Sequence, residues 1–377
     1  MTTGDEDVSG TVPARRRVVL TGISSRAWEH PADRGALTAL RELRGFDDVV
    51  KVFFGMWNER GFRLQFLGGA VRVDHRQYPR VYHRLTEAAA SLDVPELPEL
   101  YVAQSPWLNA QAIGVERPFI VVNTAAVNQL DDDELRCLLG HEIGHVRSGH
   151  AVYKTILIIL TGWAQSLSWL PVGAIALRGI IAAMYEWWRK AELSADRAGL
   201  LAGQDPAASI RLLMKLAGGG DLSEIDTAAF LEQAADYERS GDLRDSLHKI
   251  RMTAWRSHPV PVARAAQLRQ WIDSGEYGRI LAGEYPHRDG DADASTANDV
   301  KAAADSYREA FERSQDPLVA LLRRLGDGAT DVGAWAGGGF ARARAWAGTA
   351  GDAAARAAAR GRRPDPEPPA DDADASQ

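Results

Sequence analysis

The feature that most constrains this chain is a five-residue run, His141-Glu142-Ile143-Gly144-His145, which matches the pattern H-E-x-x-H. Four residues are about one turn of an α-helix, so both imidazoles would project from one face and could hold one metal ion. An acidic first turn at 131–134 offsets the exposed N–H groups of a helix start. Apolar residues recur at helical spacing through the motif. The motif therefore lies on a predicted helix from about residue 131 to beyond His145.

The residue types of this motif suit a catalytic zinc ion, and we predict one Zn²⁺ per chain. Neutral imidazole nitrogen binds zinc at about 2.0–2.1 Å, and zinc lowers the pKa of its water toward about 7. Glu142 would lie beside that water, where it can take a proton and pass it to a leaving amine. The plainer alternative is a solvated helix with two histidines and a glutamate. The apolar periodicity around the motif argues against that alternative.

A catalytic zinc usually has three protein ligands and one open position. A third histidine in the extended motif would need glycine at 148 and histidine at 151, but the chain has Ser148 and Ala151. His150 is one position early, so we interpret it as a helix-end residue. The remaining candidate for the third ligand is a glutamate from a second helix, and Glu192 is that residue. Asp196, one turn later, can hold a ligand imidazole by its other nitrogen.

The combined motifs resemble family M48 of the zinc metallopeptidases. The matching pieces span Leu100 to about Leu268, a little under half the chain, and they are 100–103, 109–112, 119–122, 133–135, 141–145, 192–196, 257–259 and Arg264. The resemblance implies an α+β, mainly helical fold: a zincin-like (gluzincin) peptidase domain with a small sheet beside the H-E-x-x-H helix. Membrane-bound members of the family carry transmembrane helices before the motif, whereas no segment before His141 in this sequence is apolar enough to span a membrane.

The resemblance also implies two further site segments. Asn109, Ala110, Gln111 and Ala112 would lie near an edge strand that holds an extended peptide, and an unpaired strand edge can bind a peptide through main-chain hydrogen bonds. The loop at His258 would approach the zinc. This histidine could stabilise the oxyanion of the tetrahedral intermediate, cap the metal in a resting state, or only open a helix.

Outside the motifs, the pattern divides the chain into regions. Residues 1–16 are a predicted flexible tail, 17–98 a mixed α/β region, 99–275 the peptidase domain, 289–360 an Ala/Gly/Arg-rich helical region, and 361–377 a disordered tail. Strands are predicted at 100–103 and 119–122, with a hairpin at 62–73 around Gly68-Gly69. Helices are predicted at 33–43, 78–92, 186–201, 207–216, 227–239, 260–272 and 298–313.

Residues 155–177 form an uncharged segment of 23 residues, long enough to cross a bilayer once. A single crossing would put His141 and Glu192 on opposite sides of the membrane, which contradicts a shared zinc ion. The insert 152–188 is therefore a helical hairpin, an interfacial helix pair, or helices buried in the protein or an oligomer. Aromatic residues favour a membrane interface: Trp163, Trp169, Tyr185, Trp187 and Trp188.

Composition limits the remaining choices. A net charge of −7 gives no basic footprint for nucleic acid. The single cysteine, Cys137, cannot form an internal disulfide. Arg15-Arg16-Arg17 precedes only three apolar residues, too few for a signal peptide, so we expect a cytoplasmic, membrane-associated catalytic domain.

The sequence thus predicts a zinc metalloendopeptidase that acts on polypeptides, in protein quality control at a membrane. The alternatives are a zinc-bound scaffold without catalysis, which would not need Glu142, and a zinc hydrolase of a non-peptide amide. The sequence leaves the oligomeric state open.

Overall fold

The computed structural model describes residues 17–42, 46–166, 173–239 and 260–291. The predicted tails at 1–16 and 361–377, the region from 292 to 360 with its helix at 298–313, and the loop that contains His258 lie outside these residues.

The described strands form one mixed sheet in the order β1-β2-β4-β3. Strand β2 pairs parallel with β4, with Leu100 opposite Ile120, and β3 pairs antiparallel with β4, with Ala110 opposite Val122. The strands are β1 (Val71–Arg72), β2 (Leu100–Ala103), β3 (Ala110–Ile113) and β4 (Phe119–Asn123). The two predicted strands at 100–103 and 119–122 are confirmed, and the segment at 109–112 forms most of the edge strand β3.

Each face of the sheet is covered by helices, as the alternation of its side chains requires. Phe119 and Val121 of β4 point to one face and pack with Phe62 and Phe66 of helix α3 (Glu59–Gly69). Ile120 and Val122 point to the other face and belong to the main core. That core also holds the helix that carries His141 and His145, so the sheet directly supports the site.

The described helices confirm a mainly helical fold. Besides α3 they are α1 (Pro31–Glu42), α2 (Phe46–Met56), α4 (Pro79–Ser91), α5 (Thr124–Gln129), α6 (Asp132–Arg147), α7 (His150–Ser166), α8 (Gly173–Gly203), α9 (Pro206–Gly218), α10 (Thr227–Arg239), α12 (Pro261–Asp273) and α13 (Glu276–Leu281). Every predicted helix in the described residues is present within a few residues of its predicted bounds, except that the helix predicted at 186–201 begins earlier, at Gly173. Helices α2, α3, α5 and α13 were not predicted.

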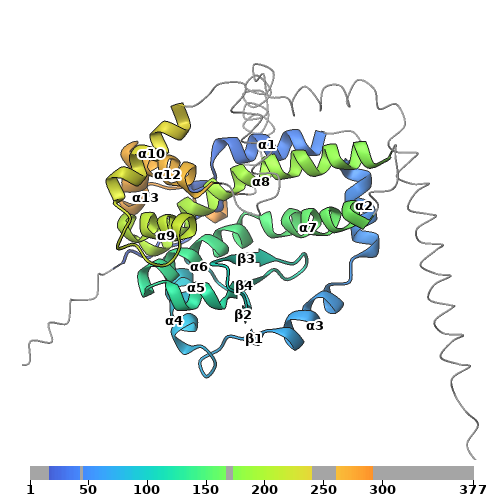
Figure 1. Cartoon of the computed structure of the whole chain (residues 1–377), viewed down its shortest axis with the longest axis horizontal. Coiled ribbons are helices and arrows are strands. Elements are labelled where there is room, and N and C mark those ends of the chain that lie inside the picture. The colour runs from blue at the N-terminus through green and yellow to red at the C-terminus, as the bar shows by residue number, and fades with distance from the viewer. Residues whose placement is uncertain (1–16, 43–45, 167–172, 240–259, 292–377) are drawn as a thin grey trace, which may run out of the picture.

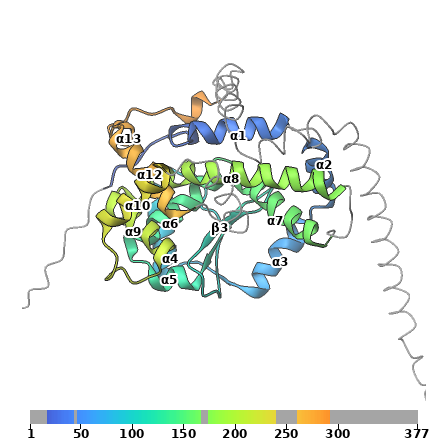
Figure 2. The same cartoon turned by 45° about the horizontal axis from the view of Figure 1, so that its top comes forward.

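The elements are layered (Figures 1 and 2). Helices α6 and α7 contact strand β3, helix α8 packs on α6 and α7, and α1 packs on α8. The site thus lies between the sheet and the long helix α8, in the middle of the stack. Helices α9, α10 and α12 gather around one end of α8, and α2 lies toward the other end.

The predicted hairpin at 62–73 is wrong. The segment is helix α3, which starts after Asn58, whose side chain accepts a hydrogen bond from the backbone of Gly61. Only Val71–Arg72 forms a strand. Phe62, Leu64 and Phe66 alternate as a strand would, but Phe62 and Phe66 are also one helical turn apart and both cover Phe119. Gly68 and Gly69 end the helix and do not turn a hairpin.

The apolar insert forms two helices that pack on each other, α7 and the first half of α8. A second core holds buried residues of α7 and α8 together with α1 and α2. Trp187 and Trp188 are 0% and 2% exposed, so their proposed role as membrane-interface anchors is wrong. No helix among the described residues combines the length and the apolar character needed to cross a membrane.

Candidate metal centre and active site

Helix α6 starts at a capping box that holds its first turn. The Asp131 carboxylate accepts a hydrogen bond from the backbone of Glu134 at 2.8 Å, and the Glu134 carboxylate accepts one from the backbone of Asp131 at 2.9 Å. Lys215 and Arg211 of α9 bind the buried Glu134 carboxylate. The acidic start predicted from sequence therefore also fixes α6 against α9.

Small residues let α6 and α8 approach closely at the site. A Cβ atom on Gly144, between the two histidines, would lie 2.5 Å from the Cβ of Ala198. A Cβ on Gly199 would lie 2.7 Å from the carbonyl oxygen of Cys137. Real Cβ atoms do not approach this closely, so glycine is required where the backbones meet. This contact brings Glu192 of α8 over the histidines of α6.

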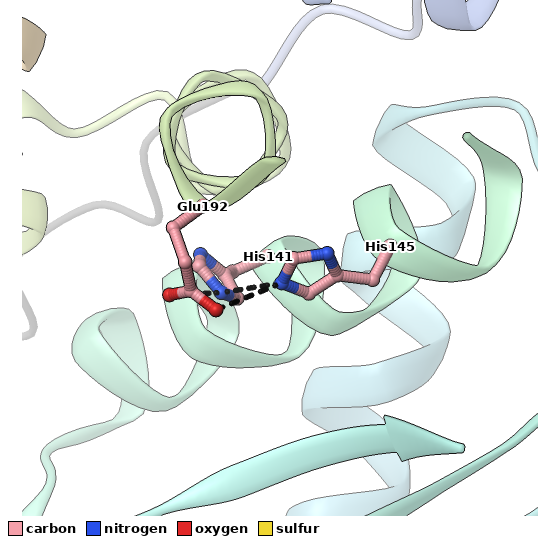
Figure 3. A group of neighbouring side chains, drawn as sticks. All are labelled: His141, His145 and Glu192. Carbon is pink, nitrogen blue, oxygen red and sulfur yellow. Dashed lines mark hydrogen bonds and ion pairs between the residues drawn. The ribbon is translucent and has the colours of Figure 1, made fainter. Parts of the chain in front are cut away.

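His141, His145 and Glu192 converge on one buried point (Figure 3). The Nε2 atoms of His141 and His145 are 3.1 Å apart, and the Glu192 oxygens lie 3.6 Å from Nε2 of His141 and 3.4 Å from Nε2 of His145. Tetrahedral ligands with bonds of about 2.0–2.1 Å would be separated by about 3.3 Å. The donor types and the spacing of these three residues therefore fit zinc.

The His141 imidazole is held from behind by Asp196 and Arg264. Its Nδ1 lies 3.1 Å from Oδ1 of Asp196. The guanidinium of Arg264 donates to both oxygens of Asp196, and its Nη1 lies 2.9 Å from Oε2 of Glu192. Burial would raise the pKa of Asp196, but the charge and hydrogen bonds of Arg264 lower it below its ordinary value. Asp196 is thus an acceptor that leaves Nε2 of His141 free to bind a metal.

The His145 imidazole is held by His150 and Asp33, two residues without a predicted role in the site. Nδ1 of His145 lies 3.0 Å from Nδ1 of His150, and Nε2 of His150 lies 3.0 Å from Oδ2 of Asp33. Ser194 and Trp187 also donate to Asp33. If Nε2 of His145 binds a metal, its Nδ1–H donates to His150, whose Nε2–H donates to Asp33. His150 is outside the group of three converging ligands, as its spacing indicated.

Burial sets the charge of His145, and hydrogen-bond partners set the charge of Asp33. Burial holds the pKa of His145 well below its ordinary value, against the opposing effect of Glu192. Burial would raise the pKa of Asp33, but the charge and hydrogen bond of His150, followed by the bonds from Ser194 and Trp187, lower it. A neutral imidazole and an ionised carboxylate are the forms that metal binding through this relay requires.

Replacing His150 by Phe should weaken zinc binding by about 10- to 100-fold, because His145 loses the acceptor that fixes its tautomer. Competition with a chromogenic zinc chelator measures the affinity. Asp33→Asn, one step further along the relay and with His150 still present, should weaken it less. Unchanged affinity in the His150 variant would contradict the relay.

The general base predicted from the motif, Glu142, is 1% exposed, and its Oε2 atom is fully enclosed with no hydrogen-bond partner among the described residues. Lys154 of α7 is also buried, and the Glu142 carboxylate opposes the lowering of the pKa of this lysine by burial. This carboxylate oxygen is therefore available to accept a hydrogen bond. Lys154 was not identified from sequence, although its position one turn after His150 on an apolar helix was a signal.

The predicted peptide-binding segment lies next to the site. Strand β3 is the outer strand of the described sheet, with β4 on one side, and it contacts both α6 and α7. Ala110 and Ala112 are buried, while Asn109 and Gln111 are partly exposed. The predicted site residue His258 lies outside the described residues, so its three possible roles stay open.

The family model of Peptidase family M48 matches residues 75–272, which is more than half of the chain. This chain belongs to peptidase family M48. The matched region contains β2 to α12 and includes the converging residues His141, His145 and Glu192. The resemblance seen in the motifs is confirmed, and the chain is a peptidase of a metal-dependent family.

Curated relatives agree with this family. The chain is 36% identical over 259 residues, 67% of its length, to a protein of Arabidopsis thaliana named Plastoglobule-localized metallopeptidase 48, chloroplastic, of which the match covers 74%. It is 26% identical over 251 residues, 60% of its length, to a Protease HtpX homolog of Ralstonia pickettii, of which the match covers 85%. No solved structure matches the chain.

Proposed function

We propose that this M48 peptidase is a zinc-dependent endopeptidase in which His141, His145 and Glu192 hold the metal. The observation that carries the proposal is the convergence of these three side chains in a buried site, where the two Nε2 atoms lie 3.1 Å apart and 3.6 and 3.4 Å from an oxygen of Glu192. Two neutral imidazoles and one carboxylate match a common ligand set of catalytic zinc, which keeps a fourth position open. Bound zinc would supply a Lewis acid that polarises water and the peptide carbonyl.

The protein's own residues perform the proton transfers in this proposal. Glu142 accepts a proton from the attacking water and then donates it to the nitrogen of the leaving amine. Asp196 and the relay through His150 keep the two histidines oriented throughout, so the reacting groups stay in place. His258, which the resemblance places near the zinc, remains a candidate donor to the oxyanion.

Strand β3 supplies the proposed substrate site. An extended peptide added to the open edge at Asn109, Ala110, Gln111 and Ala112 would bind through main-chain hydrogen bonds. Such binding depends little on side chains and needs no free chain end. It therefore favours internal bonds of unfolded polypeptides as the substrate, over a small non-peptide amide.

Incubation with unfolded casein tests this proposal, with the new chain ends identified by mass spectrometry. We expect new termini inside the casein chains. Loss of terminal residues alone would contradict endopeptidase action, and intact casein would favour the idle scaffold. The buried Glu142 carboxylate speaks against that scaffold, because zinc binding alone does not need it.

We further propose contact with a lipid surface, with the catalytic domain on the cytoplasmic side and in a role in protein quality control. The relative from Arabidopsis thaliana is named as plastoglobule-localized. Most of the described large apolar side chains of the insert 152–188 are in the protein core, but Ile158 of α7 is 44% exposed. Co-flotation of the full chain with phospholipid vesicles tests this contact, and recovery only in the lipid-free fraction would contradict it.

A further inference from the structure

Helix α7 places a lysine in the interior of the active site. Lys154 is 5% exposed, and its Nζ atom is enclosed without a hydrogen-bond partner. No salt bridge to Lys154 is formed by the described carboxylates within 4.0 Å. Its one close polar contact there is with the ring of Trp188, whose centroid lies 4.2 Å from Nζ. A buried lysine without a carboxylate or carbonyl partner is rare in a folded protein, because removing an ammonium from water is costly.

The surroundings tie this lysine to the metal-binding residues. Trp188 stacks on the imidazole of His145, with a centroid distance of 4.6 Å and an angle of 21°. Lys154 is therefore held one aromatic ring away from a proposed zinc ligand. The cation–π contact offsets part of the free energy that burying the ammonium costs, but it provides no acceptor for the N–H groups of the lysine.

An acceptor without a donor lies on helix α6, which also carries His145. Burial lowers the pKa of Lys154, while the carboxylates of Glu142 and Glu192 oppose this shift, and Glu142 has the stronger effect. Oε2 of Glu142 is enclosed without a hydrogen-bond partner. Glu192, by contrast, already has the guanidinium of Arg264 at 2.9 Å. Glu142 lies three residues before His145 on α6, so it shares a helix face with the imidazole that Trp188 covers. The unused donor and the unused acceptor therefore both flank His145.

We propose that Lys154 is a positioning residue for the general base, whose Nζ donates a hydrogen bond to Oε2 of Glu142 through one bridging water. This bond would leave the other carboxylate oxygen directed at the attacking water. Both the amine and the ammonium form can donate it. The inference rests on the proposed function, since a base needs positioning only if it is used.

If Lys154 positions the general base, its removal should lower the catalytic rate without lowering the stability of the protein. Lys154→Met keeps the length of the side chain and removes both the donor and the buried charge. A variant that loses an unpaired buried polar group should melt no lower than the wild type. Its kcat should nevertheless fall by about 10- to 100-fold, part of the usual contribution of a positioned base, with KM changed by less than about threefold. Lys154→Arg, which keeps a donor, should recover a substantial part of kcat.

The test compares wild type, Lys154→Met and Lys154→Arg for zinc content, melting temperature, and kcat and KM on an unfolded casein substrate. We expect one zinc per chain in all three and a slow, stable methionine variant. A wild-type kcat in Lys154→Met would overturn the inference while leaving the proposed function intact. So would a methionine variant that loses its fold or its zinc, because the lysine would then be structural.

A binding measurement in the Glu142→Gln background separates positioning from substrate contact. Adding Lys154→Met to that variant should leave the affinity for an unfolded peptide unchanged, because the lysine acts through Glu142. Weaker peptide binding would place the lysine on the substrate and overturn the inference. A wild-type chain that holds zinc but cleaves nothing would instead defeat the proposed function, and the positioning role with it.

Discussion

Replacing Glu142 by Gln is expected to abolish peptide hydrolysis while zinc stays bound. The amide has nearly the size of the carboxylate, so the packing around this 1% exposed side chain is kept. It cannot accept the proton of the attacking water, and loss of a positioned base costs roughly 10²–10⁴-fold in rate. The rate of casein cleavage and the zinc content of the same preparation are the two measurements.

A matched control separates this effect from a general change of charge. Glu116, an exposed residue between β3 and β4, undergoes the same change in Glu116→Gln and should retain full activity. Cleavage by the Glu142 variant at a rate within threefold of the wild type would show that another group is the base. Loss of zinc from that variant would show that Glu142 is needed for the metal site itself.

Replacing Glu192 by Ala is expected to remove zinc from the protein. The change deletes one of three converging ligand atoms and leaves two imidazoles, and loss of a direct ligand should weaken binding by more than the 10- to 100-fold typical of residues behind the ligands. It also deprives Arg264 of its 2.9 Å contact, although both oxygens of Asp196 still bind this guanidinium. Activity should fall with the zinc content.

Dialysis against a weak chelator, followed by elemental analysis, measures this effect. Glu186→Ala is the control, since Glu186 is on the same helix but pairs with Arg189 and Lys190 away from the site. Zinc also raises the melting temperature of a protein that binds it only when folded. The wild type and the control should show this shift and the Glu192 variant should not. Stoichiometric, tightly held zinc in the Glu192 variant would mean that another residue is the third ligand.

The sequence predicts the core of the site well because that core is local. His141 and His145 are one helical turn apart, as are Glu192 and Asp196, so each pair is readable from spacing on its own helix. That the two helices meet could be inferred from one further fact, namely that a catalytic zinc ion needs a third protein ligand. The structure brings His141, His145 and Glu192 together and places Asp196 behind His141.

The missed residues reach the site through the tertiary fold. Asp33 is 161 residues from Ser194, with which it shares a hydrogen bond, and no spacing rule connects them. Lys154 lies in an apolar helix whose composition suggested a membrane, so its charge was not considered as part of the site. The same reasoning assigned Trp187 and Trp188 to a membrane interface, whereas they pack around His150, His145 and Lys154. Apolar helices look alike in sequence whether lipid or protein covers them.

The error at 62–73 has a related cause. Phe62, Leu64 and Phe66 fit a period of two residues, and the i, i+4 pair of Phe62 and Phe66 also fits a period of 3.6. Tertiary contacts decide whether the segment is a strand or a helix. Both rings pack on Phe119 of β4, and only a helix brings residues four apart to one partner in this way. The sheet has only the short strand β1 after this helix.

The central claim is that the site of His141, His145 and Glu192 holds one zinc ion that this protein uses to cleave polypeptides. The most direct test measures zinc per chain and casein cleavage in one preparation, before chelation, after chelation, and after zinc is added back. The account predicts one zinc per chain, with activity lost and regained in proportion to the metal. Cleavage that persists in a preparation shown to be metal-free would contradict it.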